Sequence, residues 1–140
     1  MSTPKQGIKD GKPTHYTVGA IIKKDEKYLL IHHKVYGYAC VAGHIDEGEE
    51  PAQALVREVR EESGLTVEDH QLVIDEFVPW NWCTKGVTGH HCYVYDCAVS
   101  GEVKQDTVET TSIGWYTLEE IRQLPLEPVW DMWFKKLVIL

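Results

Sequence analysis

The segment around residues 51–63 constrains the fold more tightly than any other part of the sequence. Pro51 suits the first turn of a helix, where its missing N–H costs nothing, and Gly64 suits the left-handed position that ends one. Between them, apolar side chains recur at the spacing of one buried helix face: Ala52, Leu55, Val56 and Val59. The sequence therefore predicts a helix over residues 51–63 with an apolar face.

Strand-like and helical patterns surround this helix. β-Branched and aromatic residues predict strands at residues 15–23, 28–32, 38–42, 72–82, 90–99 and 113–116. Thr117 and Glu120 have the spacing of a capping box for a short helix at residues 118–124, and Pro128 begins a last helix that runs toward Leu140. Residues 1–13 are expected to form a flexible N-terminal lead-in, and residues 14–140 a single domain. The order of elements predicts an α+β fold, in which helices pack on a mixed sheet.

Composition limits the classes of function. The chain has 140 residues and a formal net charge of −8, with 22 acidic and 14 basic side chains. This balance argues against strong nucleic-acid binding, which needs a basic surface. An acidic protein that binds phosphate needs a cation between the two, or a local basic patch. No apolar run has the length of a membrane span, no signal-peptide core is present, and the four cysteines form no C-x-x-C pair. We therefore expect a cytoplasmic protein without a membrane partner.

Three glutamates project from one face of the predicted helix. Glu58, Glu61 and Glu62 stand at i, i+3 and i+4, where like charges destabilise a helix by about 0.2–0.5 kcal/mol per i,i+4 pair. Arg57 can reach Glu61 at i+4. Such a cluster of oxygen ligands suits Mg²⁺ or Mn²⁺. Taken alone, however, three glutamates more often form a solvated face, because glutamate is a good helix former.

The residues on either side of the glutamates favour the metal site. From Gly43 the chain reads GHIDEGEEPAQALVREVREESGL. This stretch resembles the Nudix box, G-x5-E-x7-R-E-U-x-E-E-x-G-U, in which U is bulky and apolar. Every specified position agrees: Gly43, Glu49, Arg57, Glu58, Val59, Glu61, Glu62, Gly64 and Leu65. The order of elements around the box is also Nudix-like, so the resemblance implies an α/β/α sandwich with a central mixed sheet.

The resemblance implies a hydrolase that cleaves a P–O–P linkage by metal-activated water. The expected substrate is a nucleoside triphosphate or another nucleoside diphosphate derivative, and the expected cofactor is Mg²⁺, for which Mn²⁺ can substitute. Carried over by position, Glu58 and Glu62 are the principal metal ligands, and the backbone carbonyl of Gly43 adds another. Glu61 is a third ligand or holds metal-bound water. The alternative is a non-catalytic Nudix-fold module that senses a nucleotide, although such proteins usually lose box carboxylates and this chain keeps them all. Many relatives are dimers, so a homodimer is compatible with the resemblance, but the sequence leaves the oligomeric state open.

The remaining catalytic roles also follow from the resemblance. Arg57, with Glu49 as its partner, would orient the glutamates. The general base is a box glutamate in some relatives, which points to Glu58 or Glu61, and a distant loop residue in others. Glu109, six residues before Trp115, is the best candidate outside the box, although a surface charge is an equally good interpretation.

Aromatic residues outside the box are candidates for substrate binding. Trp80 and Trp82 fall two apart on the predicted strand, and with Tyr36 they could stack on a flat substrate group. Packing or a dimer contact explains them equally well.

A zinc site is not expected. Cys83, His90, His91 and Cys92 have the spacing of no closed zinc pattern, and strand alternation sends His91 and Cys92 to opposite faces.

Overall fold

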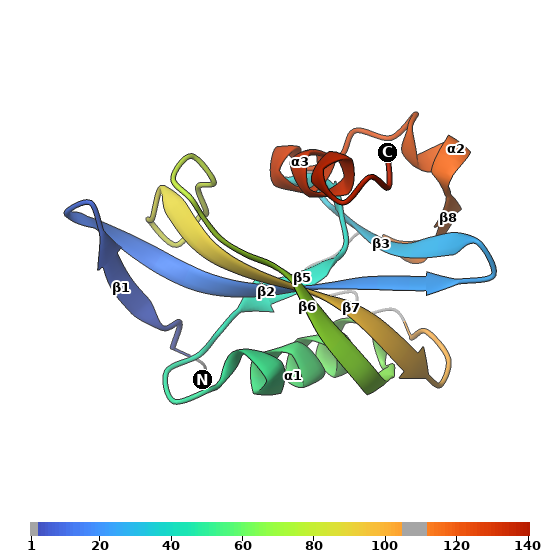
Figure 1. The fold of residues 1–140 in the computed structure, drawn as a ribbon, viewed down its shortest axis with the longest axis horizontal. Helices are drawn as coiled ribbons and strands as arrows, with labels where there is room; N and C mark the ends of the chain where they lie inside the picture. Colours follow the sequence, from blue (N-terminus) through green and yellow to red (C-terminus); the bar gives the residue numbers. More distant parts are fainter. Residues whose placement is uncertain (1–2, 105–111) are drawn as a thin grey trace.

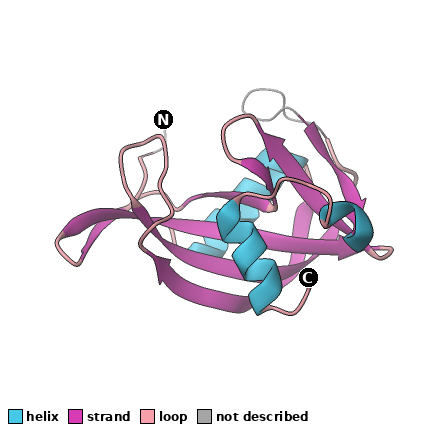
Figure 2. Ribbon diagram, turned by 90° about the horizontal axis from the view of Figure 1, so that it is seen from above, coloured by secondary structure: helices cyan, strands magenta, loops and turns pink. Residues whose placement is uncertain are grey.

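The computed structural model describes residues 3–104 and 112–140, so Glu109 lies outside the described residues. In this part of the chain a sheet of eight strands lies between helices. Helix α1 (Pro51–Ser63) covers one face of the sheet, while α2 (Leu118–Ile121) and α3 (Pro128–Lys136) lie on the other side (Figures 1 and 2). The prediction of an α+β sandwich is confirmed. No described helix is long and apolar enough to cross a membrane.

The sheet is mixed, as predicted. Its main path runs β4-β3-β2-β7-β6, with β1 and β5 also on β2 and β8 on β3. The β2–β7 pair is parallel and the other pairs are antiparallel. The strands are β1 (Gln6–Lys9), β2 (Lys12–Lys24), β3 (Lys27–His33), β4 (Gly37–Ala39), β5 (Val41–His44), β6 (Thr66–Val78), β7 (Gly89–Ser100) and β8 (Ser112–Thr117).

The N-terminal segment differs from the expected flexible lead-in. Strand β1 forms an antiparallel hairpin with the start of β2, pairing Gln6 with His15 and Lys9 with Lys12. The turn is Asp10-Gly11, and both residues have positive φ, at 51° and 76°. A two-residue hairpin turn of this kind requires such angles, and Asp-Gly favours them. The polar composition of residues 1–13 obscured this local signal.

Other element boundaries also differ from the predicted ones. The strand expected at residues 38–42 is divided at Cys40, because β4 pairs with β3 whereas β5 pairs with β2. Strand β6 ends at Val78, before Trp80 and Trp82. The two C-terminal helices end earlier than expected, at Ile121 and Lys136.

Two hydrophobic cores lie on opposite sides of the sheet. Val18, Ala20 and Ile22 of β2 belong to the core under α1, whereas Ile21 belongs to the core under α3. This alternation follows from the two-residue period of a strand. Leu55 and Val59 of α1 are buried in the first core, and each such side chain stabilises the fold by about 1.5–3 kcal/mol. The packing of α1 therefore determines the direction in which the face with the glutamates points.

Candidate metal centre and substrate pocket

Both ends of α1 are held by local hydrogen bonds. The backbone N–H of Glu50 donates to Gln53 Oε1 (2.9 Å), and the Glu50 carboxylate accepts the reciprocal bond from the backbone of Gln53. At the other end Gly64 has φ 79° and donates its N–H to the carbonyl of Arg60 (2.9 Å). Because the helix begins and ends at defined residues, its glutamates have a defined position relative to the loop before it.

Gly43 of β5 lies directly against the carboxyl group of Glu58. A β-carbon at position 43 would be 2.2 Å from Glu58 Cδ and 2.4 Å from each of its carboxyl oxygens. No side chain fits in that space. The absence of a side chain at Gly43 therefore allows the carboxyl group to approach the backbone of β5.

Arg57 connects helix α1 to the loop before it, residues 45–50. Its Nε donates to Glu49 Oε2 (2.8 Å) and its Nη2 to Glu49 Oε1 (2.9 Å), a bidentate pair. The backbone N–H of Asp46 also donates to Glu49 Oε1 (2.8 Å). The hydrogen bond from Arg57 lowers the pKa of Glu49, so this carboxyl group stays ionised. Planar, two-point pairing of this kind restrains both side chains.

The same guanidinium reaches two of the box glutamates. Arg57 Nη1 donates to Glu58 Oε1 (2.8 Å) and to Glu61 Oε2 (3.3 Å), and Nη2 donates to the carbonyl of His44 (3.0 Å). Arg57 thus links the β5 end, the loop and the helix face. This is the arrangement that a residue orienting the glutamates requires.

The glutamate cluster fits a divalent cation. Glu58 is largely buried, and burial raises its pKa, while hydrogen bonds with Glu62 and Arg57 oppose that rise. The carboxyl groups of Glu58 and Glu62 are in contact, and such a pair needs a shared proton or a cation to offset its repulsion. Together with Glu61 and Gly43 they line a pocket of about 220 Å³ that contains oxygen donors of the kind Mg²⁺ prefers.

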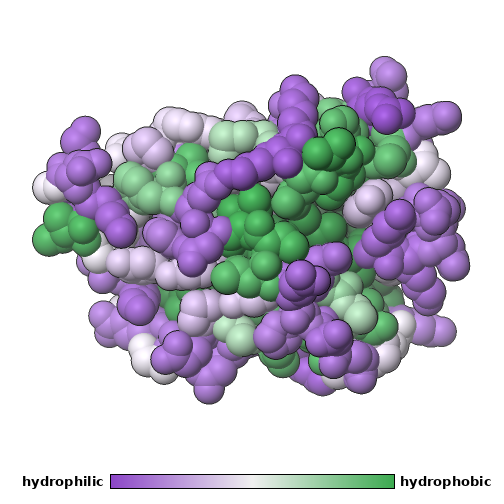
Figure 3. Space-filling model, viewed as in Figure 1, coloured by the Kyte–Doolittle hydropathy of each residue, from purple (hydrophilic) through white to green (hydrophobic). Residues whose placement is uncertain are grey.

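A larger and more apolar pocket of about 480 Å³ adjoins the acidic one. The two share His33, Ala42, Gly43, His44 and Lys85, so they form one continuous cleft. In the space-filling view, apolar side chains gather in the middle of the face shown, within a polar rim (Figure 3).

Of the three predicted substrate-binding residues, Tyr36 and Trp82 line the apolar pocket and Trp80 does not. The Tyr36 and Trp82 rings are 5.6 Å apart, and the Tyr36 hydroxyl accepts from the backbone N–H of Thr84 (3.1 Å). Trp80 is 50% exposed. The prediction that both tryptophans lie on a strand was wrong, because β6 ends at Val78.

The sequence motifs identify only part of the cleft. Lys85 lines both pockets, and it is a lone cation in a polar loop that no motif identifies. Glu127 lies at the start of α3, and burial raises its pKa to about 7. Four further side chains, His15, His44, Cys83 and His90, gather beside the acidic pocket. Burial lowers the pKa of all three histidines, that of His44 to about 3.

Known proteins are similar to this chain over most of its length. A family model described as NUDIX domain matches residues 13–136. The NAD-capped RNA hydrolase NudC of Photorhabdus laumondii is 34% identical over 110 residues, which are 76% of this chain and 39% of that protein. The chain thus spans about two fifths of the length of the curated relatives it matches.

Two solved structures are similar in fold and sequence. The MutT NUDIX hydrolase from Burkholderia pseudomallei superposes with a TM-score of 0.73 at 26% identity, covering 85% of this chain and 94% of that one. The E. coli ORF135 protein superposes with a TM-score of 0.69 at 25% identity, covering 92% and 96%.

Proposed function

This chain belongs to the NUDIX domain family, and from that membership we propose that it is a Mg²⁺-dependent hydrolase that cleaves a P–O–P linkage in a nucleotide derivative. The observation that carries the proposal is the contact between the Glu58 carboxyl group and the backbone of Gly43, with Arg57 oriented across both. The candidate ligands of the box, Gly43, Glu58, Glu61 and Glu62, also line one small pocket, which supports a shared cation there.

The two parts of the cleft suit the two parts of such a substrate. The cation would be held by the carboxylates of Glu58 and Glu62 and by the carbonyl of Gly43, with Glu61 beside it to contact its bound water. When bound, it neutralises diphosphate charge and lowers the pKa of water. Lys85, shared by both pockets, adds a positive charge where the diphosphate would lie. The apolar pocket, with Tyr36 and Trp82, would take the flat group attached to it.

The chain's own residues orient the site and accept the proton. Arg57 holds Glu58 in place, as its 2.8 Å hydrogen bond and its fork on Glu49 indicate. Glu61 is 57% exposed and has one 3.3 Å contact with Arg57, which leaves it able to accept a proton from the attacking water. We propose Glu61 as the base within the described residues. Glu109 stays the candidate outside them.

The identity of the substrate is a separate proposal. A pocket of about 480 Å³ has the size of a site for one small organic group, and its aromatic walls suit a nucleobase. A nucleoside triphosphate or another nucleoside diphosphate derivative fits these features. A cytoplasmic location and a homodimer likewise stay predictions.

A substrate panel tests the proposal. The protein is incubated with nucleoside triphosphates, ADP-ribose, NADH, NAD-capped RNA, dinucleoside polyphosphates and nucleotide sugars, with and without Mg²⁺, in ¹⁸O-labelled water. Chromatography and mass spectrometry should show Mg²⁺-dependent products with ¹⁸O on phosphorus, and Glu62→Gln should make far less of them. Absence of turnover for every compound, together with tight binding of one, would instead indicate a nucleotide sensor.

A further inference from the structure

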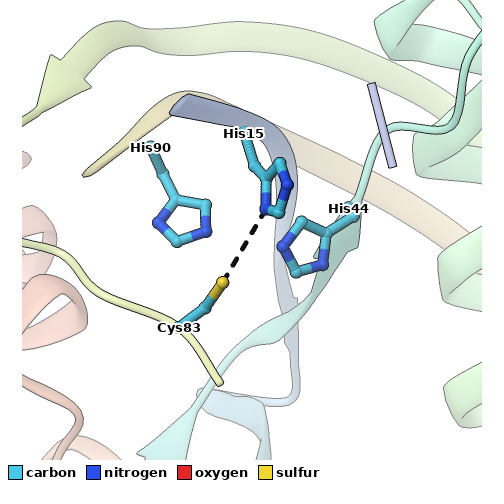
Figure 4. Close-up of side chains that lie close together, drawn as sticks. All are labelled: His15, His44, Cys83 and His90. Atoms are coloured by element: carbon cyan, nitrogen blue, oxygen red, sulfur yellow. Dashed lines mark hydrogen bonds between the residues drawn. The ribbon is translucent and has the colours of Figure 1, made fainter. Parts of the chain in front are cut away.

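Four metal-ligating side chains meet beside the acidic pocket. One ligand atom from each of His15, His44, Cys83 and His90 can be chosen so that all four lie within 4.8 Å of one another. His15 Nδ1 is 3.7 Å from Cys83 Sγ. Figure 4 shows three imidazole rings converging on the thiol, which approaches from a loop. Within the part of the chain that the structure describes, this is the one group of three or more His, Cys, Asp or Glu side chains whose ligand atoms converge in this way.

The register of the sheet produces the cluster. His15 of β2 and His90 of β7 are direct partners in the parallel pair. His44 of β5 pairs with Thr17, which lies two residues from His15 and therefore on the same face. Cys83 comes from the segment between β6 and β7. Three neighbouring strands thus present one histidine each, and the loop brings a thiol over them.

The hydrogen bonding around the cluster leaves nitrogen atoms available for a ligand. His90 Nδ1 contacts the carbonyl of Asn81, which can only accept, so this nitrogen carries the proton and Nε2 keeps its lone pair. The Nε2 of His44 is buried and has no hydrogen-bond partner among the described residues. A buried polar nitrogen without a partner is costly, and a metal ion would satisfy it.

We propose that His15, His44, Cys83 and His90 bind a Zn²⁺ ion in a closed tetrahedral site, distinct from the glutamate site. Nitrogen and sulfur donors suit Zn²⁺, whereas Mg²⁺ prefers oxygen. Zinc–ligand bonds of about 2.0–2.3 Å place neighbouring ligand atoms about 3.3–3.8 Å apart. The 3.7 Å distance from His15 to Cys83 already fits, and the widest separation of 4.8 Å needs to close by about 1 Å.

The proposed ligands differ from the four residues considered from the sequence, which were Cys83, His90, His91 and Cys92. His91 points to the other face of β7 from His90, where its Nε2 contacts Asp75. Cys92 is buried in the core with α3. In their place, His15 and His44 come from strands far apart in the sequence.

The site would hold the wall of the substrate cleft in place. Four protein ligands leave no open position for a reacting group, which is the property of a structural zinc site. Cys83 is flanked by Trp82 and Thr84, which line the apolar pocket, and His44 follows Gly43. Zinc would therefore fix the loop over the sheet next to the glutamate site without taking part in hydrolysis.

Cobalt substitution tests the site without reference to activity. The full chain is stripped with a chelator and titrated with Co²⁺, which reports geometry and ligand type through its visible spectrum. We expect one Co²⁺ per chain, intense tetrahedral d–d bands, a sulfur-to-cobalt charge-transfer band and displacement by Zn²⁺. A wild-type protein that binds no Co²⁺ with these bands overturns the proposal.

Matched variants assign the ligands. Glu62→Gln and His91→Asn should leave the spectrum unchanged, whereas Cys83→Ser should lose the charge-transfer band. If Cys83→Ser does not fold, Cys83→His decides, because it should keep one Co²⁺ per chain and lose only the sulfur band. A spectrum that survives in both Cys83 variants and disappears in Glu62→Gln would place the metal on the glutamates and refute the site. Failure of the hydrolase proposal would leave these spectra unaffected.

Discussion

The backbone of Gly43 and the carboxyl group of Glu58 are so close that a β-carbon at position 43 would lie 2.2 Å from Glu58 Cδ. One residue comes from β5 and the other from α1, and they are 15 positions apart in the sequence. The contact places the Glu58 carboxyl group against the α-carbon of Gly43, with no side chain between them. It also makes the smallest substitution at position 43 informative.

Gly43→Ala should displace the Glu58 carboxyl group and lower kcat/KM by about 10–100-fold, the range typical when the geometry of a metal site is disturbed. Titration of activity with Mg²⁺ should show that a higher Mg²⁺ concentration is needed for half-maximal activity. Gly114→Ala is the control, because a β-carbon there meets only ordinary contacts at 3.6 Å or more. Equal activity in the two variants would mean that the contact has no functional role.

Arg57→Lys keeps the positive charge but loses the planar fork on Glu49. We expect kcat to fall by about 10–100-fold with a smaller change in KM, because Lys cannot hold Glu49 and Glu58 at once. Arg60→Lys is the matched control, since the one side-chain hydrogen bond of Arg60 to a described residue goes to Thr66 Oγ1, away from the glutamates. Steady-state kinetics of both variants decide the matter, and unchanged kcat in Arg57→Lys contradicts the orienting role.

Glu62→Gln should reduce kcat by more than the roughly 100-fold that outer-shell residues typically account for, because it removes a charge from a proposed metal ligand. Circular dichroism should show an unchanged fold. Glu109→Gln should reduce turnover less if Glu109 is an accessory ligand. A larger effect of Glu109→Gln, measured in the same single-turnover assay, would identify Glu109 as the base in place of Glu61.

Trp82→Ala should raise KM roughly tenfold, because loss of one stacking contact with a base weakens binding by about 1–3 kcal/mol. Trp80→Ala should leave KM near its original value, since Trp80 does not line the pocket. Both side chains are about half exposed, at 53% and 50%, so the pair is well matched for exposure. The measurement is substrate affinity by kinetics or calorimetry, and equal KM values would show that Trp82 does not contact substrate.

Glu127 should make stability depend on pH. Burial raises its folded-state pKa to about 7, above an ordinary value of 4.5, so the folded protein holds this proton more tightly than the unfolded chain does. Its contribution is therefore favourable below pH 4.5 and is lost as pH rises to about 7. At pH 8 Glu127→Gln should be more stable than wild type by roughly 2 kcal/mol, and near pH 4 the two should agree.

Urea unfolding across that pH range measures the effect of Glu127. Glu119→Gln removes an exposed carboxyl group and is the control. A difference between wild type and Glu127→Gln that does not change with pH would mean that the carboxyl group is not buried in its charged form.

Local signals predicted some elements and missed others. Pro51 and Gly64 define α1 residue for residue, and Thr117 caps α2, because caps and turns depend on neighbours in the chain. The Asp10-Gly11 hairpin carried an equally local signal that the composition of the segment obscured. The division at Cys40 had no local signal, since it depends on which strand lies alongside.

The sequence by itself determined the helix, the spacing of its glutamates and the family to which the chain belongs. These depend on periodicity and on residues within one continuous stretch, which a helix maps directly onto one face. The tertiary structure decided the contact between Gly43 and Glu58, the different positions of Trp80 and Trp82, and the meeting of three histidines with Cys83. Those depend on strand register and loop path, which place residues far apart in the chain within a few ångströms of each other.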